Sequence, residues 1–206
     1  MTGCCEKKTD SLEALATSQR RTLWLVFFIN FFMFLFEAAY GFVADSSALL
    51  ADSLDMFADA AAYGVSLYAV SMGAMVKARV SYFKGLLMIF LGLLVFLKAC
   101  YRLYDPVMPS FDMMFWVSIA ALLANLWCLK LLWKHRFDDI NFSSVWLCSR
   151  NDIMANSAVI LSAVCIYYTG SYLFDIFIAA VISLLFLRSG FLVTREAKTI
   201  LANFSE

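Results

Sequence analysis

Three aspartates lie close together within an otherwise apolar stretch of the chain. Asp52, Asp55 and Asp59 are separated by three and then four residues, so a helix would carry all three along one face. An ionised carboxylate at the centre of a membrane costs about 2.5–3.5 kcal/mol by insertion scales and more by simulation. A segment that carries several such groups usually binds or moves something polar. The pattern therefore predicts a site for a metal ion or a proton.

A second polar group follows further along the chain. Cys148, Asp152 and Asn156 are four residues apart, so they also share one helical face. Asp55 and Asp59 have the same four-residue spacing. Two helices that each offer two ligands one turn apart can surround one ion with four donors, which is the tetrahedral arrangement that zinc adopts. The first interpretation is therefore one metal site with four ligands, namely Asp55, Asp59, Cys148 and Asp152.

The donor atoms bear on which metal the site would select. Three carboxylates and one thiolate suit Zn²⁺, Co²⁺ or Cd²⁺ better than Mg²⁺, which prefers oxygen ligands and keeps its waters. A set that omits Cys148 and uses Asn156 instead would favour harder ions such as Mn²⁺ or Fe²⁺. Zn²⁺ is the expected ion, and Co²⁺, Cd²⁺, Mn²⁺ and Fe²⁺ are the alternatives. No cofactor is required beyond the bound metal.

Four further residues are secondary candidates for metal binding. Asp52 is either a direct ligand or a hydrogen-bond acceptor beside the site. Glu37 stands alone in an apolar stretch, where it would be a second ligand, a proton relay, the partner of a buried base or a neutral structural acid. Cys4 and Cys5 are adjacent and cannot form a relaxed disulfide with each other. They are either a hook for a soft metal or an incidental pair in the tail.

Long apolar segments position these residues. The chain has 206 residues, of which 63% are hydrophobic and 16% are charged, against about 45–50% and 25% in soluble domains. A membrane span needs about 20 mostly apolar residues. We therefore predict an all-α, six-helix transmembrane bundle with spans at 22–44, 47–71, 81–103, 112–134, 144–168 and 171–192. The predicted regions are a cytoplasmic tail (1–20), the transmembrane domain (21–193) and a short cytoplasmic tail (194–206).

The distribution of basic residues predicts the orientation. Basic residues precede span one, join spans two and three, join spans four and five, and follow span six, whereas the other connections are acidic or neutral. Lys98 and Arg102 are exceptions to this pattern. By the positive-inside rule both termini lie in the cytoplasm. The net charge of zero gives no support for a nucleic-acid partner. The absence of a Gly-rich phosphate loop, an HExxH motif and a Ser/His/Asp set predicts that the chain is not an enzyme.

Two segments resemble a known family of transporters. Residues 46–59 resemble the second transmembrane helix of the cation diffusion facilitator family, and residues 148–188 resemble its fifth and sixth helices. The two ligand pairs of that family fall on Asp55 with Asp59 and on Cys148 with Asp152. Cys148 departs from the family pattern, which more often has His or Asp there. The sequence ends at Glu206, so it resembles the short members without the cytoplasmic C-terminal domain.

The resemblance implies a proton-coupled exporter of a divalent, zinc-like metal ion. Alternating access would expose a site between spans two and five to each side of the membrane in turn. The implied partners are the metal ion, protons, membrane lipid and a second copy of the chain bound through the spans, and the expected location is the bacterial inner, or plasma, membrane. One alternative is a monovalent cation/proton antiporter, although sodium gains little from a thiolate. Another is a membrane metal sensor or scaffold that transports nothing.

Overall fold

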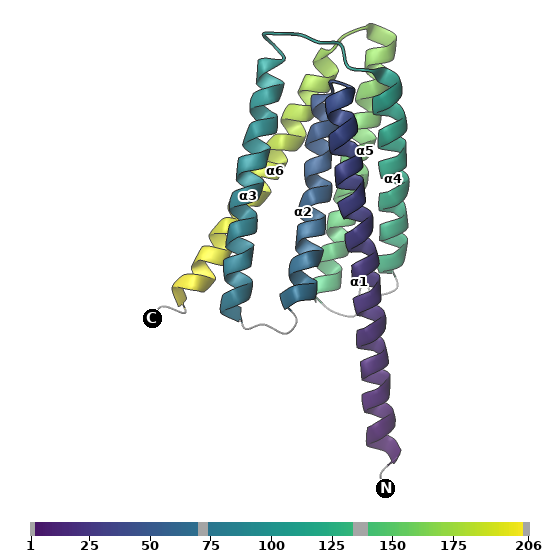
Figure 1. The fold of residues 1–206 in the computed structure, drawn as a ribbon, viewed down its shortest axis with the longest axis vertical. Helices are drawn as coiled ribbons and strands as arrows, with labels where there is room; N and C mark the ends of the chain where they lie inside the picture. Colours follow the sequence, from purple (N-terminus) through teal and green to yellow (C-terminus); the bar gives the residue numbers. More distant parts are fainter. Residues whose placement is uncertain (1–2, 70–73, 134–139, 204–206) are drawn as a thin grey trace.

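The described part of the chain is helical throughout. The computed structural model describes residues 3–69, 74–133 and 140–203, and their side chains except at 3–20, 62, 65–66, 68–69, 74, 77, 140–151 and 203. These residues form six helices and no strand, which confirms the predicted all-α bundle (Figure 1). The helices are α1 (Gly3–Val43), α2 (Ser47–Ala69), α3 (Ala74–Tyr101), α4 (Phe111–Trp133), α5 (Ile140–Thr169) and α6 (Leu173–Asn203).

Several helices extend beyond the predicted spans. Helix α1 begins at Gly3, inside the predicted tail, and its first half projects from the bundle (Figure 1). Helix α6 continues to Asn203, past the predicted end of span six at residue 192. Apolar length alone sets the predicted limits of the spans. The extensions are rich in Lys, Arg, Glu and Ala, which favour helix without favouring a membrane.

Most of the helices are suited to a lipid environment. Within the described residues, five stretches are long and apolar enough to cross a membrane: Arg21–Val43, Ala78–Tyr101, Phe111–Trp133, Asp152–Thr169 and Leu173–Ala202. Large apolar side chains such as Phe32, Phe83 and Trp116 are exposed on the outside of the bundle, where lipid would cover them. Helix α2, which carries the three aspartates, is not among the five. Its residues 47–54 are all buried, so α2 is enclosed by protein.

Helix α2 is the element that links the others. It contacts α1, α3, α5 and α6, while α3 also packs along α6 and α4 along α5. Both chain ends lie at the same end of the bundle in Figure 1. The turns before α2 and before α6 lie at the opposite end, with the connection between α3 and α4. The position of α2 within the bundle places its polar residues among neighbouring helices and away from lipid.

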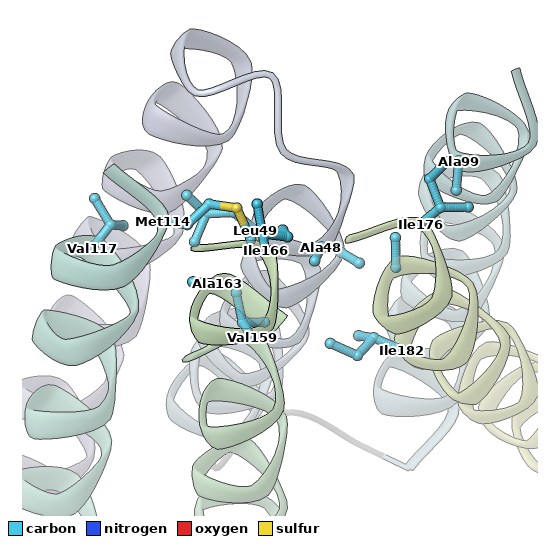
Figure 2. Packing of buried hydrophobic residues seen from close by; sticks show 12 residues of the cluster. Ala48, Leu49, Ala99, Met114, Val117, Val159, Ala163, Ile166, Ile176 and Ile182 are labelled. Atoms are coloured by element: carbon cyan, nitrogen blue, oxygen red, sulfur yellow. The ribbon is translucent and has the colours of Figure 1, made fainter. Parts of the chain in front are cut away.

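A compact apolar cluster fixes the helices at the end of the bundle opposite the chain termini. Ala48 and Leu49 of α2 lie between side chains of α4 and α5 on one side and of α3 and α6 on the other (Figure 2). The labelled partners are Met114, Val117, Val159, Ala163, Ile166, Ala99, Ile176 and Ile182. Dense packing of this kind resists shifts in side-chain position. The first turns of α2 are therefore held firmly on several sides.

A buried carboxylate holds the beginning of α2. Asp175, near the start of α6, accepts hydrogen bonds from the Ser46 hydroxyl (2.6 Å), the Ser47 amide (2.7 Å) and the Ala48 amide (3.1 Å). A helix N-terminus presents unpaired amides and a partial positive charge, so an acidic side chain stabilises it. Ser46 also accepts a hydrogen bond from the Leu49 amide, as an N-cap residue does. Asp175 thus anchors α2 to α6 through main-chain groups.

An exposed ion pair lies at the same end of the bundle. Arg102 contacts Asp45, which has a positive φ of 54° in the turn between α1 and α2. The Asp45 carboxylate, on a neighbouring turn, partly neutralises the charge of Arg102. Lys98 lies 4.9 Å from the centre of the Phe42 ring, a cation–π distance.

Helices α3 and α6 approach each other unusually closely. Gly85 of α3 faces Gly190 and Thr194 of α6, and a Cβ atom at residue 85 would lie 2.9 Å from the Thr194 amide nitrogen. A Cβ atom at residue 190 would lie 3.2 Å from the Gly85 carbonyl oxygen. Small residues let transmembrane helices approach in this way, and the resulting van der Waals contacts hold them together. These two glycines therefore set the spacing of α3 and α6.

Candidate metal-transport site

The aspartates of α2 point into the bundle to different degrees. Asp52 is fully buried and Asp59 is 6% exposed. Asp55, between them, is only partly buried. A soluble helix would turn such residues to water, so their burial in an enclosed helix is costly unless the carboxylates gain a partner. The shared acidic face that the spacing predicts is present in the structure.

Helix α5 brings a fourth aspartate to this face. Asp152 is 5% exposed, and its carboxyl group shares a side-chain hydrogen bond with that of Asp59. It also interacts electrostatically with Asp55 and, more weakly, with Asp52. Two ionised carboxylates repel each other at such separations, so this pair needs a bound cation or a shared proton. The structure therefore joins one predicted ligand from each of the two predicted pairs.

Asn156 connects α5 to the upper part of the acidic face. Its Nδ2 atom donates a hydrogen bond to the Asp152 main-chain oxygen at 2.8 Å and lies 3.5 Å from Asp52 Oδ1. The side chain is fully buried. Asn156 therefore lies beside Asp52, whereas Asp152 lies beside Asp59. These contacts span about two turns of α2 and about one turn of α5.

Glu37 adds a carboxylate from α1. It is fully buried and interacts electrostatically with Asp52 first and with Asp55 second. Neither of its carboxylate oxygens has a hydrogen-bond partner among the described residues. Glu37 therefore belongs to the same polar interior as the α2 aspartates. None of the described contacts pairs it with a base, which was one of the alternatives for this residue.

Tyr63 and Cys128 border the polar interior on the side of the chain termini. The Tyr63 hydroxyl donates a hydrogen bond to Asp59 Oδ2 at 3.0 Å. Cys128 of α4 is fully buried and interacts electrostatically with Asp59 and Asp152. Asn30 of α1 contacts the Cys128 sulfur at 3.8 Å. The hydrogen bond from Tyr63 therefore fixes one carboxylate oxygen of Asp59 at the border of the polar interior.

The acidic groups form an elongated series and not one compact cluster. Among the side chains that the structure describes, no three histidine, cysteine, aspartate or glutamate residues converge tightly enough to hold a metal ion. The side chains of Cys148, Cys4 and Cys5 lie outside the described residues, so the predicted fourth ligand and the predicted tail hook remain predictions. The complete set of Asp55, Asp59, Cys148 and Asp152 is likewise untested.

Several buried oxygen atoms along this series have no partner within the described structure. They are both oxygens of Glu37, Asp52 Oδ2, Asp152 Oδ2 and Asn156 Oδ1. A buried polar atom left unpaired costs about 1–3 kcal/mol, and more if it is charged. A cation or a proton would satisfy these acceptors. The interior is thus suited chemically to hold positive charge at successive positions between α1, α2 and α5.

Sequence reasoning missed three residues that shape this region. Tyr63 follows Asp59 by four residues, so the helical spacing that grouped the aspartates would also have found it. Cys128 and Asp175 carry no such signal. Each lies on another helix and meets α2 only through the tertiary fold.

The comparisons with known proteins agree with this architecture. The family model of the cation efflux transmembrane domain matches residues 23–202. Zinc transporter ZitB of Yersinia pestis is 25% identical over 193 residues, covering 87% of this chain and 62% of that protein. ZitB of Pectobacterium atrosepticum is 29% identical over 191 residues, covering 86% of this chain and 59% of that protein.

The name of a third relative covers several metals. The "Cadmium, cobalt and zinc/H(+)-K(+) antiporter" of Bacillus subtilis is 26% identical over 195 residues, covering 85% of this chain and 62% of that protein. This chain thus spans about three fifths of the length of these relatives. The apolar helices and the domain match together identify an integral, multi-pass membrane protein. Because the match covers most of its residues, the chain belongs to the cation efflux family.

Proposed function

We propose that this protein exports a divalent, zinc-like metal ion from the cytoplasm in exchange for protons. The observation that carries the proposal is the pairing of Asp59 on α2 with Asp152 on α5 in a buried, membrane-depth interior. Asp55 and Cys148 complete the proposed site. The names of the relatives, which include zinc, cadmium and cobalt, support a divalent transition metal as cargo.

The donor chemistry accounts for coupling to protons. Carboxylates and thiolates bind a metal only when deprotonated, so loading the site releases protons and reprotonation expels the metal. Tyr63 holds one oxygen of Asp59, which orients the carboxylate toward α5. Alternating access would require the contact between α2 and α5 to open toward one side of the membrane at a time. Asp175 and the apolar cluster hold the first turns of α2. We therefore propose that the C-terminal half of α2 moves more than its first turns during transport.

We propose that both termini face the cytoplasm of a bacterial inner membrane. The first turns of α3 and the last turns of α6, which carry Arg79, Arg195 and Lys198, lie at the end of the bundle where the termini lie. A homodimer formed through the spans is part of the same proposal. The exposed aromatic and aliphatic side chains of α1, α3 and α6 offer apolar surface for such contacts and for lipid.

Transport by the purified chain tests this function. Proteoliposomes loaded with a metal-sensitive dye and given a pH gradient across the bilayer should accumulate Zn²⁺, and a proton ionophore should stop the accumulation. Empty liposomes and liposomes with the Asp59→Ala variant are the controls. Movement of sodium or potassium without Zn²⁺, Co²⁺, Cd²⁺, Mn²⁺ or Fe²⁺ would favour a monovalent antiporter. Tight metal binding with no movement would favour a sensor.

The choice of metal depends on residue 148. We expect Cys148→Ser to reduce Zn²⁺ and Cd²⁺ transport at least about tenfold relative to Mn²⁺, because a soft thiolate is replaced by a hydroxyl that binds these ions poorly. Competition assays in proteoliposomes with paired metals would measure the ratio. Cys165→Ser on the same helix is the matched control and should leave the ratio unchanged. An unchanged ratio in Cys148→Ser would remove the thiolate from the site.

A further inference from the structure

A groove runs along the outer side of α1, next to α4. Its volume is about 610 Å³, and it is lined by side chains of α1 between Arg21 and Met33 and by Ala124 of α4. This volume lies within the usual range for sites that bind small molecules. Arg21 is the charged member of the lining, and the other lining side chains are apolar. Ala124 contributes only a methyl group, so α4 leaves space beside α1.

Three stacked aromatic rings form the wall of this groove on α1. Trp24, Phe28 and Phe32 are four residues apart and therefore share one face of the helix. The ring centroids of Trp24 and Phe28 are 5.5 Å apart, and those of Phe28 and Phe32 are 6.3 Å apart. All three side chains are exposed. A continuous exposed apolar strip marks a surface that another apolar molecule covers, and its narrow, extended shape suits a hydrocarbon chain.

The length of the groove matches the depth of one membrane leaflet. The helix rises roughly 16 Å from Arg21 to Phe32, and half of the hydrocarbon core measures about 15 Å. Arg21 is the first residue of the apolar stretch Arg21–Val43, so it lies where the hydrocarbon meets the head groups. Trp24 and Trp133 are exposed where the start of this stretch packs against the end of α4, and exposed tryptophans are typical of this boundary. The groove therefore leads from the head groups towards the bilayer centre.

The charge at the head-group end selects the kind of lipid. The side chain of Arg21 is exposed and has no acidic partner in the described part of the chain. A guanidinium group binds phosphate oxygens through two parallel hydrogen bonds. In a zwitterionic head group the positively charged amine offsets this attraction, whereas an anionic head group keeps it in full. The charge of Arg21 therefore favours an anionic phospholipid.

We propose that this groove binds one anionic phospholipid, with its phosphate at Arg21 and one acyl chain along Trp24, Phe28 and Phe32. The bound lipid joins α1 to α4 from the outside of the bundle. On the inside, the same two helices meet where Asn30 contacts Cys128. The ligand is a membrane lipid and not the metal cargo, so the site goes beyond the proposed transport function and does not depend on it.

Native mass spectrometry of the purified full chain in detergent tests the lipid site. Phosphatidylglycerol and phosphatidylcholine with identical acyl chains would compete for the protein. We expect one phosphatidylglycerol per chain, bound at least about fivefold more tightly than phosphatidylcholine, the factor that one basic residue contributes near an anionic membrane surface. Arg21→Gln should lose this preference. Arg79→Gln is the matched control and should keep it, because Arg79 is an exposed residue of α3 outside the groove.

Two further variants test where the acyl chain lies. Ala124→Phe fills the groove and keeps Arg21, so it should weaken the binding of both lipids by a similar factor. One equivalent of phosphatidylglycerol with brominated acyl chains should quench tryptophan fluorescence in the wild type. Most of this quenching should be lost in Trp24→Phe. Size-exclusion chromatography establishes that each variant is folded, and Arg21→Gln changes only an exposed side chain.

Several results would overturn the lipid site. They are an unchanged lipid preference in Arg21→Gln, an equal loss of preference in Arg79→Gln, and full quenching in Trp24→Phe. A dimer that carries no lipid and dissociates in Ala124→Phe would assign the groove to a second copy of the chain, which also overturns the proposal. These measurements contain no metal, so their outcome is separate from that of the transport assay.

Discussion

Asp59→Ala and Asp152→Ala should each reduce metal transport by more than about 100-fold, because even residues that only support metal ligands change affinity or activity about 10- to 100-fold when mutated. Each change removes one member of the carboxyl pair that joins α2 to α5. The variants should still insert into the membrane, since removing a charge from a span makes insertion easier. Proteoliposome uptake measures the rate, and membrane fractionation measures the insertion.

The exposed acid Asp112 at the start of α4 provides a matched control. Asp112→Ala removes the same chemical group at a position outside the polar interior, so its transport rate should equal that of the wild type. Normal transport by either Asp59→Ala or Asp152→Ala would contradict a shared site between α2 and α5. An equal loss in Asp112→Ala would mean that the assay reports general damage from lost acidic charge.

The second large effect concerns the contact between α3 and α6. We expect Gly85→Ala to destabilise the protein by about 1–3 kcal/mol, the usual cost of forcing extra atoms into a packed interface. The new Cβ would lie 2.9 Å from the Thr194 amide nitrogen and 3.1 Å from the Gly190 carbonyl oxygen. These are main-chain atoms, so the helices themselves must separate. Thermal unfolding in detergent would measure the change.

Gly64→Ala is the matched control for this prediction. The same added methyl group would lie 3.2 Å from a ring carbon of Phe27, a side chain that can move. Alanine also favours helix over glycine by about 1 kcal/mol. The melting temperature of Gly64→Ala should therefore stay near that of the wild type. Equal melting temperatures for the two variants would contradict the close approach of α3 and α6.

The sequence predicts the helices well because the signals for them are local. Apolar length identifies the membrane segments, and the spacing of Asp52, Asp55 and Asp59 predicts one acidic face, which the buried side chains of Asp52 and Asp59 confirm. Apolar length says nothing about where a helix ends outside the membrane. For that reason α1 and α6 run past their predicted limits.

The contacts between distant residues could not be predicted from spacing. Asp175 and Ser47 are 128 residues apart, and Asn156 and Asp52 are 104 residues apart. Only the packing of α2 against α5 and α6 brings these groups together. In the sequence, Asp52 and Asn156 are separate secondary candidates, whereas in the structure they are neighbours. The family resemblance and the equal spacing on two helices predict one site that contains both Asp59 and Asp152, and this shared site stays a prediction.

A structure of the Zn²⁺-loaded protein, with zinc located by its anomalous scattering, tests the central claim most directly. The account predicts an anomalous peak between α2 and α5, about 2.0–2.2 Å from carboxylate oxygens of Asp59 and Asp152. Anomalous density confined to another part of the chain, such as the Cys4–Cys5 pair, in a preparation that transports zinc would contradict it.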